Sequence, residues 1–215
     1  MIKIYILKTH DMTKDDADGT ILSLPFGEGE RQRLLSLGNI DRRLESLGGL
    51  MALWRLCDLC GVDLPKEIRR GNTGKPYFLG DTSPSFSISH TEGFAAAAMD
   101  TSGADLGLDI ELIRKMPRSE QIAERFFSVE EKRLFYEQSG SDDCFFRIWT
   151  AKESMAKLNG TGLSAILADR SLPPCHALQD IIEADRQRLC LSLCQHTKIS
   201  SADVYINGSL RKAIT

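Results

Sequence analysis

Residues 105–112 have the sequence Asp-Leu-Gly-Leu-Asp-Ile-Glu-Leu, the clearest strand pattern in the chain. Apolar side chains at alternate positions point to one side of an extended segment, while Asp109 and Glu111 point to the other. A rise of about 3.3 Å per residue separates those two carboxylates by roughly 7 Å. An isolated pair of this kind is most often a solvated polar face, but it also suits a hard divalent cation such as Mg²⁺. We expect a strand with one face in the core.

The rest of the chain mixes strand and helix patterns. Strand patterns occur at residues 1–7, 86–90, 189–193 and 204–206, and residues 94–99 are a short run of small residues that can pack closely against a neighbour. Helical periodicity covers residues 28–60 and 143–159, and Ser128 followed by Glu131 is a capping box that begins a further helix. Because no strand–helix unit repeats, an α+β fold is favoured over a doubly wound sheet. A composition break near residues 100–103 is the one plausible boundary.

Composition excludes several classes of protein. The 215 residues carry 27 Lys+Arg and 30 Asp+Glu, a net charge of −3, and 42% are hydrophobic. This balance argues against a broadly cationic nucleic-acid binder, and no apolar run reaches the roughly 18 residues that span a bilayer. The six cysteines lack a zinc-ligand pattern, and Cys57-x-x-Cys60 lies in an apolar helical segment, so we interpret them as buried thiols. We expect a cytoplasmic globular protein that binds neither membrane nor nucleic acid.

A second motif, Trp149-Thr-Ala-Lys-Glu-Ser-Met-Ala-Lys157, belongs to the helical segment at 143–159. Trp149, Glu153 and Lys157 are four residues apart and therefore form one stripe on a helix. A surface Glu–Lys pair is the ordinary interpretation. The aromatic residue on the same stripe instead favours a position for Glu153 at the rim of a cleft, where a carboxylate and an ammonium suit a metal-assisted phosphoryl site.

A third group of residues is basic and turn-rich. Gly74-Lys75-Pro76 places a lysine on a rigid loop, and Ser89-His90 ends a strand with a hydroxyl and an imidazole. Each of these side chains could contact a phosphate oxygen, although the glycine spacing before Lys75 is not that of a P-loop.

Five blocks, in this order and spacing, resemble the 4′-phosphopantetheinyl transferases, most closely the larger single-chain type that activates peptide and polyketide synthases. The similarity runs from about Gly71 to Leu163. Its blocks are Gly74-Lys75-Pro76, Phe86-Ser-Ile-Ser-His90, Gly107-Leu-Asp-Ile-Glu111, Phe126-Phe-Ser128 with Glu131, and Trp149 to Lys157 followed by Gly160-Thr-Gly-Leu163.

The resemblance implies two similar α+β halves related by pseudo-twofold symmetry, with the active site in the cleft between them. Residues 1–102 would then form the half that binds the coenzyme A nucleotide, and residues 103–215 the metal-binding and catalytic half. The implied reaction moves 4′-phosphopantetheine from coenzyme A to a serine of an apo acyl or peptidyl carrier protein and releases 3′,5′-ADP. Because one chain would supply both halves, the resemblance implies a monomer. The implied enzyme is a 4′-phosphopantetheinyl transferase of the holo-[acyl-carrier-protein] synthase type.

The resemblance also implies residue roles. Asp109, Glu111 and Glu153 would hold Mg²⁺, and Lys157 would neutralise the transferring phosphate. Lys75, Ser89 and His90 would bind the nucleotide end of the coenzyme, including its 3′-phosphate. Arg31, Arg33 and Arg43 resemble basic positions of the family's N-terminal half, of which Arg31 and Arg43 would also bind the coenzyme. Glu131 would assist catalysis or serve only as a helix cap.

The carrier serine needs a general base, for which Glu153, Glu131 and a metal-bound water remain candidates. Arg114, Lys115, Arg118 and Arg125 are candidates for contacting the acidic helix of a carrier, or else form a solvated charged segment. Two other functions stay open: a Mg²⁺-dependent hydrolase of coenzyme or nucleotide pyrophosphates, and a non-catalytic binding module.

Overall fold

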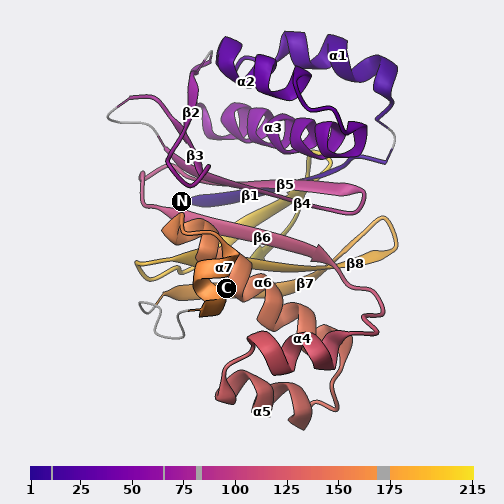
Figure 1. Ribbon diagram of the computed structural model, residues 1–215. Helices are drawn as coiled ribbons and strands as arrows, with labels where there is room; N and C mark the ends of the chain where they lie inside the picture. The colour runs from indigo at the N-terminus through magenta and orange to yellow at the C-terminus, as the bar shows by residue number, and fades with distance from the viewer. Residues whose placement is uncertain (11, 65, 81–83, 169–174) are drawn as a thin grey trace.

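The computed structural model describes residues 1–10, 12–64, 66–80, 84–168 and 175–215, which form two sheets packed face to face with helices outside them (Figure 1). Apolar strand residues such as Ile4, Leu108, Leu191 and Val204 are fully buried in the core between the sheets. The alternation at residues 105–112 predicted a strand with its apolar face in the core, and the burial of Leu106, Leu108 and Ile110 confirms it.

The first sheet has the strand order β10-β9-β1-β5-β4. Strand β1 (Ile2–Lys8) pairs antiparallel with β5 (Phe94–Asp100) and parallel with β9 (Ala202–Ile206). Strands β4 (Ser85–Thr91) and β10 (Ser209–Ile214) lie at the edges. Strands β9 and β10 near the C-terminus therefore belong to the same sheet as β1 at the N-terminus.

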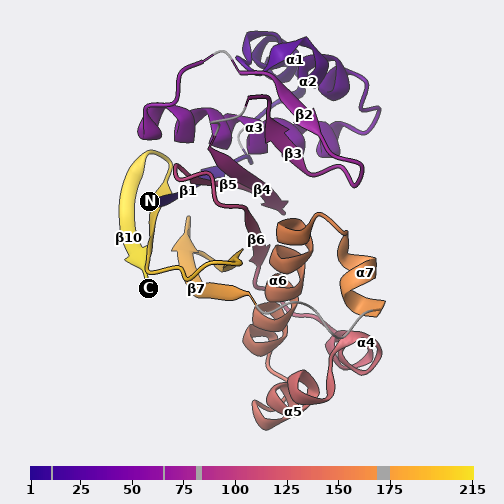
Figure 2. The same cartoon turned by 90° about the vertical axis from the view of Figure 1, so that its left-hand side faces the viewer.

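Helix α3 (Ile40–Cys60) covers the outer face of the first sheet, and α1 (Lys14–Ser23) and α2 (Gly27–Leu35) pack on the far side of α3 (Figure 2). The helical pattern predicted over residues 28–60 is split in two, because Asn39 caps the start of α3 by accepting a hydrogen bond from the Arg42 backbone. A short hairpin of β2 (Ile68–Arg70) and β3 (Pro76–Phe78) follows α3.

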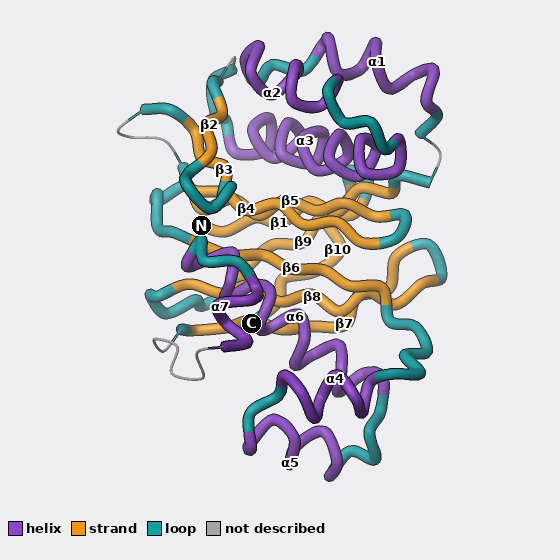
Figure 3. The backbone as a smooth tube through the Cα atoms, in the orientation of Figure 1, coloured by secondary structure: helices purple, strands orange, loops and turns teal. Residues whose placement is uncertain are grey.

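The second sheet has the order β6-β8-β7, formed by Leu106–Leu112, Gln187–Gln195 and His176–Ala184. Helix α6 (Asp142–Asn159) packs on it, and Figure 3 shows α4 (Ser119–Phe126), α5 (Val129–Glu137) and α7 (Leu163–Ala168) around α6. Gly107 allows this close packing, since a Cβ there would lie 1.9 Å from the Ser154 carbonyl oxygen. Gly160 ends α6 in the left-handed conformation, as the sequence predicted.

Hydroxyl groups join the two sheets along β4 and β6. The side chains of Ser87, Ser89 and Thr91 on β4 accept hydrogen bonds from the backbone N–H groups of Leu108, Ile110 and Leu112 on β6, at 3.0, 3.3 and 3.1 Å. These contacts satisfy the backbone donors of β6 that no strand pairs. They also fix how far β6 lies from the N-terminal half.

The fold is mixed α+β, which confirms that part of the prediction. The pseudo-twofold relation of two halves and the division at residue 102 remain predictions. No helix in the described ranges is long and apolar enough to cross a membrane.

Candidate active site

Two carboxylates of β6 are held by the hydroxyl groups of β4. Ser89 donates to Asp109 Oδ1 at 2.7 Å, and Thr91 donates to Glu111 Oε2 at 3.0 Å. Asp109 is only 4% exposed. The acidic face predicted for residues 105–112 is therefore not a solvated surface, because β4 and α6 both pack near it.

Helix α6 adds Lys157 and Glu153 to these carboxylates. The Lys157 ammonium donates to Asp109 Oδ1 and to Ser89 Oγ, both at 2.7 Å. Burial, followed by the negative charge of Asp109, raises the pKa of Glu153 to about 7, against the opposing effect of Lys157. Burial and the Asp109 charge also raise the pKa of Glu111. Lys157 thus pairs with Asp109, and Glu111 lies 3.6 Å from the Arg114 guanidinium, so three carboxylates face two cationic side chains.

The chemistry of this group fits a cation. Asp109 Oδ2 is buried and has no hydrogen-bond partner, which leaves an anionic oxygen available to a ligand. The mutual repulsion seen in the raised pKa values of Glu111 and Glu153 would also be relieved by a divalent ion. Within the described ranges, no three His, Cys, Asp or Glu side chains form a preassembled metal cluster. The donor set is suitable in charge, while Lys157 occupies one oxygen of Asp109.

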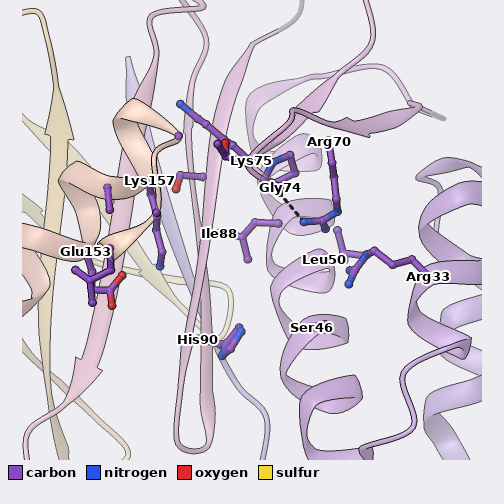
Figure 4. Close-up of a pocket in the computed structure, with 17 residues that line it drawn as sticks. Arg33, Ser46, Leu50, Arg70, Gly74, Lys75, Ile88, His90, Glu153 and Lys157 are labelled. Atoms are coloured by element: carbon purple, nitrogen blue, oxygen red, sulfur yellow. Dashed lines mark hydrogen bonds between the residues drawn. The ribbon is translucent and has the colours of Figure 1, made fainter. Parts of the chain in front are cut away.

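A cavity of about 290 Å³ opens beside Lys157 and Glu153, and residues from both halves of the sequence line it (Figure 4). Figure 4 places Glu153 and Lys157 at one end of it and Arg33 and Arg70 at the other. Lys75, Ile88 and His90 lie between these two ends. The sequence motifs that are far apart in the chain therefore meet at one cavity.

Two of the predicted coenzyme-binding residues line the middle of the cavity. Lys75 donates to the Leu158 carbonyl oxygen at 2.8 Å, which ties the loop of residues 71–75 to the C-terminal end of α6. His90 lies 3.4 Å from Glu45. Burial lowers the pKa of His90, and the Lys157 charge lowers it further against the effect of Glu45. His90 is therefore mostly neutral at neutral pH.

Ser89 lies beneath Lys157 and not on the cavity wall. Its hydroxyl donates to Asp109 and accepts from Ile110 N and from Lys157. A serine hydroxyl has one donor and two acceptor positions, so all three are in use. In this arrangement Ser89 positions Asp109 and Lys157, and a direct contact with the coenzyme remains a prediction.

The structure does not bring Arg31 and Arg43 to this cavity. Arg31 bonds to Glu28 and to the Leu24 carbonyl oxygen. Arg43 pairs with Asp18 and also donates to the backbone carbonyls of Leu35 and Leu37 at the C-terminal end of α2. Both arginines join helices of the N-terminal layer, and their predicted roles in coenzyme binding are untested.

Glu131 forms the predicted capping box, in which its carboxylate accepts from Ser128 N at 2.6 Å. The same oxygen lies 2.8 Å from the Lys152 ammonium. Glu131 is not among the residues that line the cavity. These contacts account for Glu131 as a structural residue, and its catalytic role remains a prediction.

Arg33 and Arg70 line the cavity. The sequence motifs do not single out Arg70, and the resemblance places Arg33 only among the basic positions of the N-terminal half. Arg70 ends β2 immediately before the turn at Gly71, and it donates to the Gly74 carbonyl oxygen at 3.1 Å. A basic residue beside a glycine-rich turn is a weak signal. Only the return of the chain from α3 to β2 places Arg70 next to α2.

Comparisons with known proteins agree with the motifs. The profile of the 4′-phosphopantetheinyl transferase superfamily matches residues 105–208. A 4′-phosphopantetheinyl transferase of Bacillus pumilus is 34% identical over 174 residues, 76% of this chain and 71% of that protein. The 4′-phosphopantetheinyl transferase AcpT of Salmonella typhi is 30% identical over 172 residues, 79% of this chain and 85% of AcpT. A putative enzyme of this kind from Synechocystis is 27% identical, and the aligned part spans 55% of its length.

Proposed function

The chain belongs to the 4′-phosphopantetheinyl transferase superfamily, and from this premise we propose that it moves 4′-phosphopantetheine from coenzyme A to a serine of an apo carrier protein, releasing 3′,5′-ADP. One observation carries the proposal. A single cavity joins Glu153 and Lys157 of α6 to Lys75 and His90 of the N-terminal half. Phosphoryl transfer depends mainly on positioning and on neutralising charge, which such a cavity supplies.

Lys157 is the residue best placed to neutralise the transferring phosphate. Its ammonium is part-exposed at the cavity and is anchored by Asp109 and Ser89 through two of its three N–H donors. The remaining donor is available to a phosphate oxygen. Because Lys157 is already fixed, little reorganisation accompanies the build-up of charge on the leaving group.

Asp109, Glu111 and Glu153 would hold Mg²⁺, for the reasons of charge and the unpartnered Asp109 oxygen given above. A bound Mg²⁺ would supply positive charge to the coenzyme diphosphate. The protein's own part is to hold Asp109 and Glu111 through the hydroxyl groups of Ser89 and Thr91, and to place Glu153 and Lys157 on α6.

The carrier serine loses a proton when it attacks the phosphorus atom. Glu153 lines the cavity, so its carboxylate can accept this proton when the cation does not hold it; without a cation, burial and its acidic neighbours raise its pKa to about 7. Glu131 is less suited, because its carboxylate is occupied by Ser128 N and Lys152. We propose that residues 1–102 bind the coenzyme A nucleotide, that residues 103–215 bind the metal and carry out catalysis, and that the protein acts as a monomer.

The carrier protein would dock beside the cavity after β6. Arg114, Lys115, Arg118 and Arg125 are exposed there. The Arg114 guanidinium stacks over Phe146 at 5.4 Å and that of Arg125 over Phe126 at 4.9 Å, so both arginines have a defined orientation. A basic surface of this kind complements the acidic helix of a carrier protein.

The proposal is tested by incubating the protein with coenzyme A and Mg²⁺, with and without an apo carrier protein, and measuring 3′,5′-ADP by chromatography. We expect nucleotide release only when the apo carrier is present. Equal release without an acceptor would contradict transfer and would indicate a pyrophosphate hydrolase.

A further inference from the structure

Two cysteine thiols meet where strand β7 begins. Strand β7 pairs antiparallel with β8, so that His176 lies opposite Gln195 and Ala177 opposite Cys194. Because side chains alternate along extended backbone, Cys175 falls on the same side of the sheet as Cys194, one diagonal position away. A hydrogen bond joins the two thiols, and both cysteines are free.

The two thiols differ in how accessible and how constrained they are. Cys194 is only 1% exposed, whereas Cys175 is half-buried, so a small reagent in solution reaches Cys175 first. A disulfide brings its two sulfur atoms to about 2.05 Å. Cys175 lies one residue before the first paired residue of β7, so its backbone can make this approach without breaking the strand pairing.

Cys175 also differs from the other cysteines in its acidity. The hydrogen bond from Cys194 holds the pKa of Cys175 below that of an ordinary thiol, although burial opposes this effect. The same hydrogen bond, together with burial, raises the pKa of Cys194. Burial raises the pKa of the other four thiols, those of Cys57, Cys60, Cys144 and Cys190. Cys175 is therefore the thiol best suited to begin an exchange with a disulfide, because the thiolate is the attacking form.

Cys194 connects this pair of thiols to the active-site helix. Its Sγ lies 3.1 Å from the hydroxyl oxygen of Ser154 on α6, and Ser154 is the neighbour of Glu153. Cys194 is also paired with Gly107 of β6, at the place where α6 and β6 pack most tightly. A Cys194 sulfur that moves toward Cys175 must leave Ser154, which changes the packing directly behind Glu153.

We propose that Cys175 and Cys194 form a reversible disulfide by exchange with a low-molecular-weight disulfide such as oxidised glutathione, and that this bond slows the transfer reaction. The Cys175 thiolate attacks one sulfur of oxidised glutathione and releases the first glutathione as a thiolate. Cys194 then gives up its proton, attacks the Cys175 sulfur and releases the second glutathione. The two protein thiols together lose two electrons and two protons, and oxidised glutathione is reduced to two thiols. The effect on rate rests on the proposed function, whereas the formation of the bond does not.

The test combines a count of thiols with a measurement of rate. Reduced protein is incubated with oxidised glutathione and denatured, and its remaining thiols are alkylated with N-ethylmaleimide before intact-mass measurement and peptide mapping. The variants are Cys175→Ser, Cys194→Ser and the control Cys60→Ser. Cys60 is half-buried and three residues from Cys57 in α3, so this control removes the rival pair that lies closest in sequence. Thermal unfolding of each reduced variant shows whether it is folded.

We expect the oxidised wild type, which has six cysteines, to lose two of its alkylation sites to one disulfide that joins Cys175 to Cys194. The same disulfide should form in Cys60→Ser. Cys175→Ser should form none, and Cys194→Ser should stop at a mixed disulfide of Cys175 with glutathione. Alkylation of every cysteine in the oxidised wild type, a disulfide between Cys57 and Cys60 instead, or a disulfide that persists in Cys175→Ser would overturn the inference.

The rate of carrier modification tests the consequence of the bond. We expect the oxidised wild type to be severalfold slower than the reduced protein, a dithiol reductant to restore the rate, and Cys175→Ser to keep its rate in oxidised glutathione. An unchanged rate in fully oxidised wild type would overturn the regulatory role of the disulfide. Failure of the proposed function gives a different result, because the reduced wild type would then modify no carrier protein while the disulfide still formed.

Discussion

The two ends of the cavity have opposite electrostatics. At the arginine end, the buried carboxylate of Glu30 is fully hydrogen-bonded by the guanidinium groups of Arg33 and Arg70, and the net charge is positive. At the other end, Glu153 and Lys157 line the cavity, and Lys157 pairs with Asp109 behind the wall. One buried oxygen of Asp109 has no partner, Glu111 pairs with Arg114, and the pKa of Glu153 is raised to about 7. The arginine end is complete without a cation, whereas the carboxylate end is not.

This difference indicates that the two ends of the cavity bind different phosphate groups. A preformed positive end suits a phosphate that is only bound and keeps its charge throughout the reaction. An end that holds surplus negative charge beside a lysine suits a reacting phosphate and a cation together.

Removing the charge of Asp109 should have the largest effect on turnover, because this carboxylate holds both Lys157 and Ser89. Asp109→Asn leaves Lys157 and Ser89 without their charged partner, so we expect turnover to fall by about 10²-fold or more, typical of a lost preorganised charge. The rate of carrier modification and thermal unfolding are measured together. Asp63→Asn, at an exposed position outside the cavity, is the control. A folded Asp109→Asn protein with the wild-type rate would remove the assignment.

A substitution of Gly107 tests whether α6 must pack this closely against β6, which places Glu153 and Lys157 beside Asp109. In Gly107→Ala the new Cβ would lie 1.9 Å from Ser154 O and 2.5 Å from Leu158 N, so α6 must shift. We expect a loss of about 1–3 kcal/mol in the free energy of unfolding, as for overpacked cores.

The matched control for this substitution is Gly29→Ala in α2, where no atom lies within 4 Å of the new Cβ. Gly29→Ala should be neutral or stabilising by about 0.5–1 kcal/mol. Equal unfolding free energies for the two variants in urea titrations would refute the close approach.

The pH dependence of stability tests the crowding of carboxylates. The folded-state pKa of Glu153 is raised from 4.5 to about 7, so its ionisation costs stability above pH 7 and nothing below about pH 4.5. Glu153→Gln should therefore stabilise the protein at pH 8, by about 1–2 kcal/mol after allowing for solvent at the cavity, and hardly at all at pH 4.5.

Mg²⁺ provides the second part of this test. It should raise the melting temperature of the wild type at pH 8 and raise that of Glu153→Gln much less, because the variant lacks one charged ligand. An identical response of both proteins to pH and to Mg²⁺ would contradict the crowding of charge around Glu153.

The basic surface after β6 should give the smallest effect. Arg118→Glu with Arg125→Glu should raise the KM for the carrier protein severalfold and leave the KM for coenzyme A unchanged, because exposed charges steer association. Steady-state kinetics with each substrate varied in turn measure both constants. An unchanged KM for the carrier would remove this docking surface.

Structural features could be predicted from the sequence where they depend only on residues nearby in the chain. The alternation at β6, the Ser128 capping box and the stripe of Glu153 and Lys157 on α6 were all predicted and are confirmed as structural features. The use of Ser89 to hold Asp109 and Lys157 could not be foreseen, because it depends on the distance between β4 and β6. Arg70 is a similar case, since its partner Glu30 lies 40 residues earlier.

The central claim is that this cavity transfers phosphopantetheine to a serine. Its most direct test is intact-mass measurement of a panel of apo carrier proteins after incubation with the protein, coenzyme A and Mg²⁺. We predict that at least one carrier gains the mass of a single phosphopantetheine group, and that the same carrier with its acceptor serine replaced by alanine gains none. No mass gain on any carrier, by a folded protein that binds coenzyme A, would contradict the account.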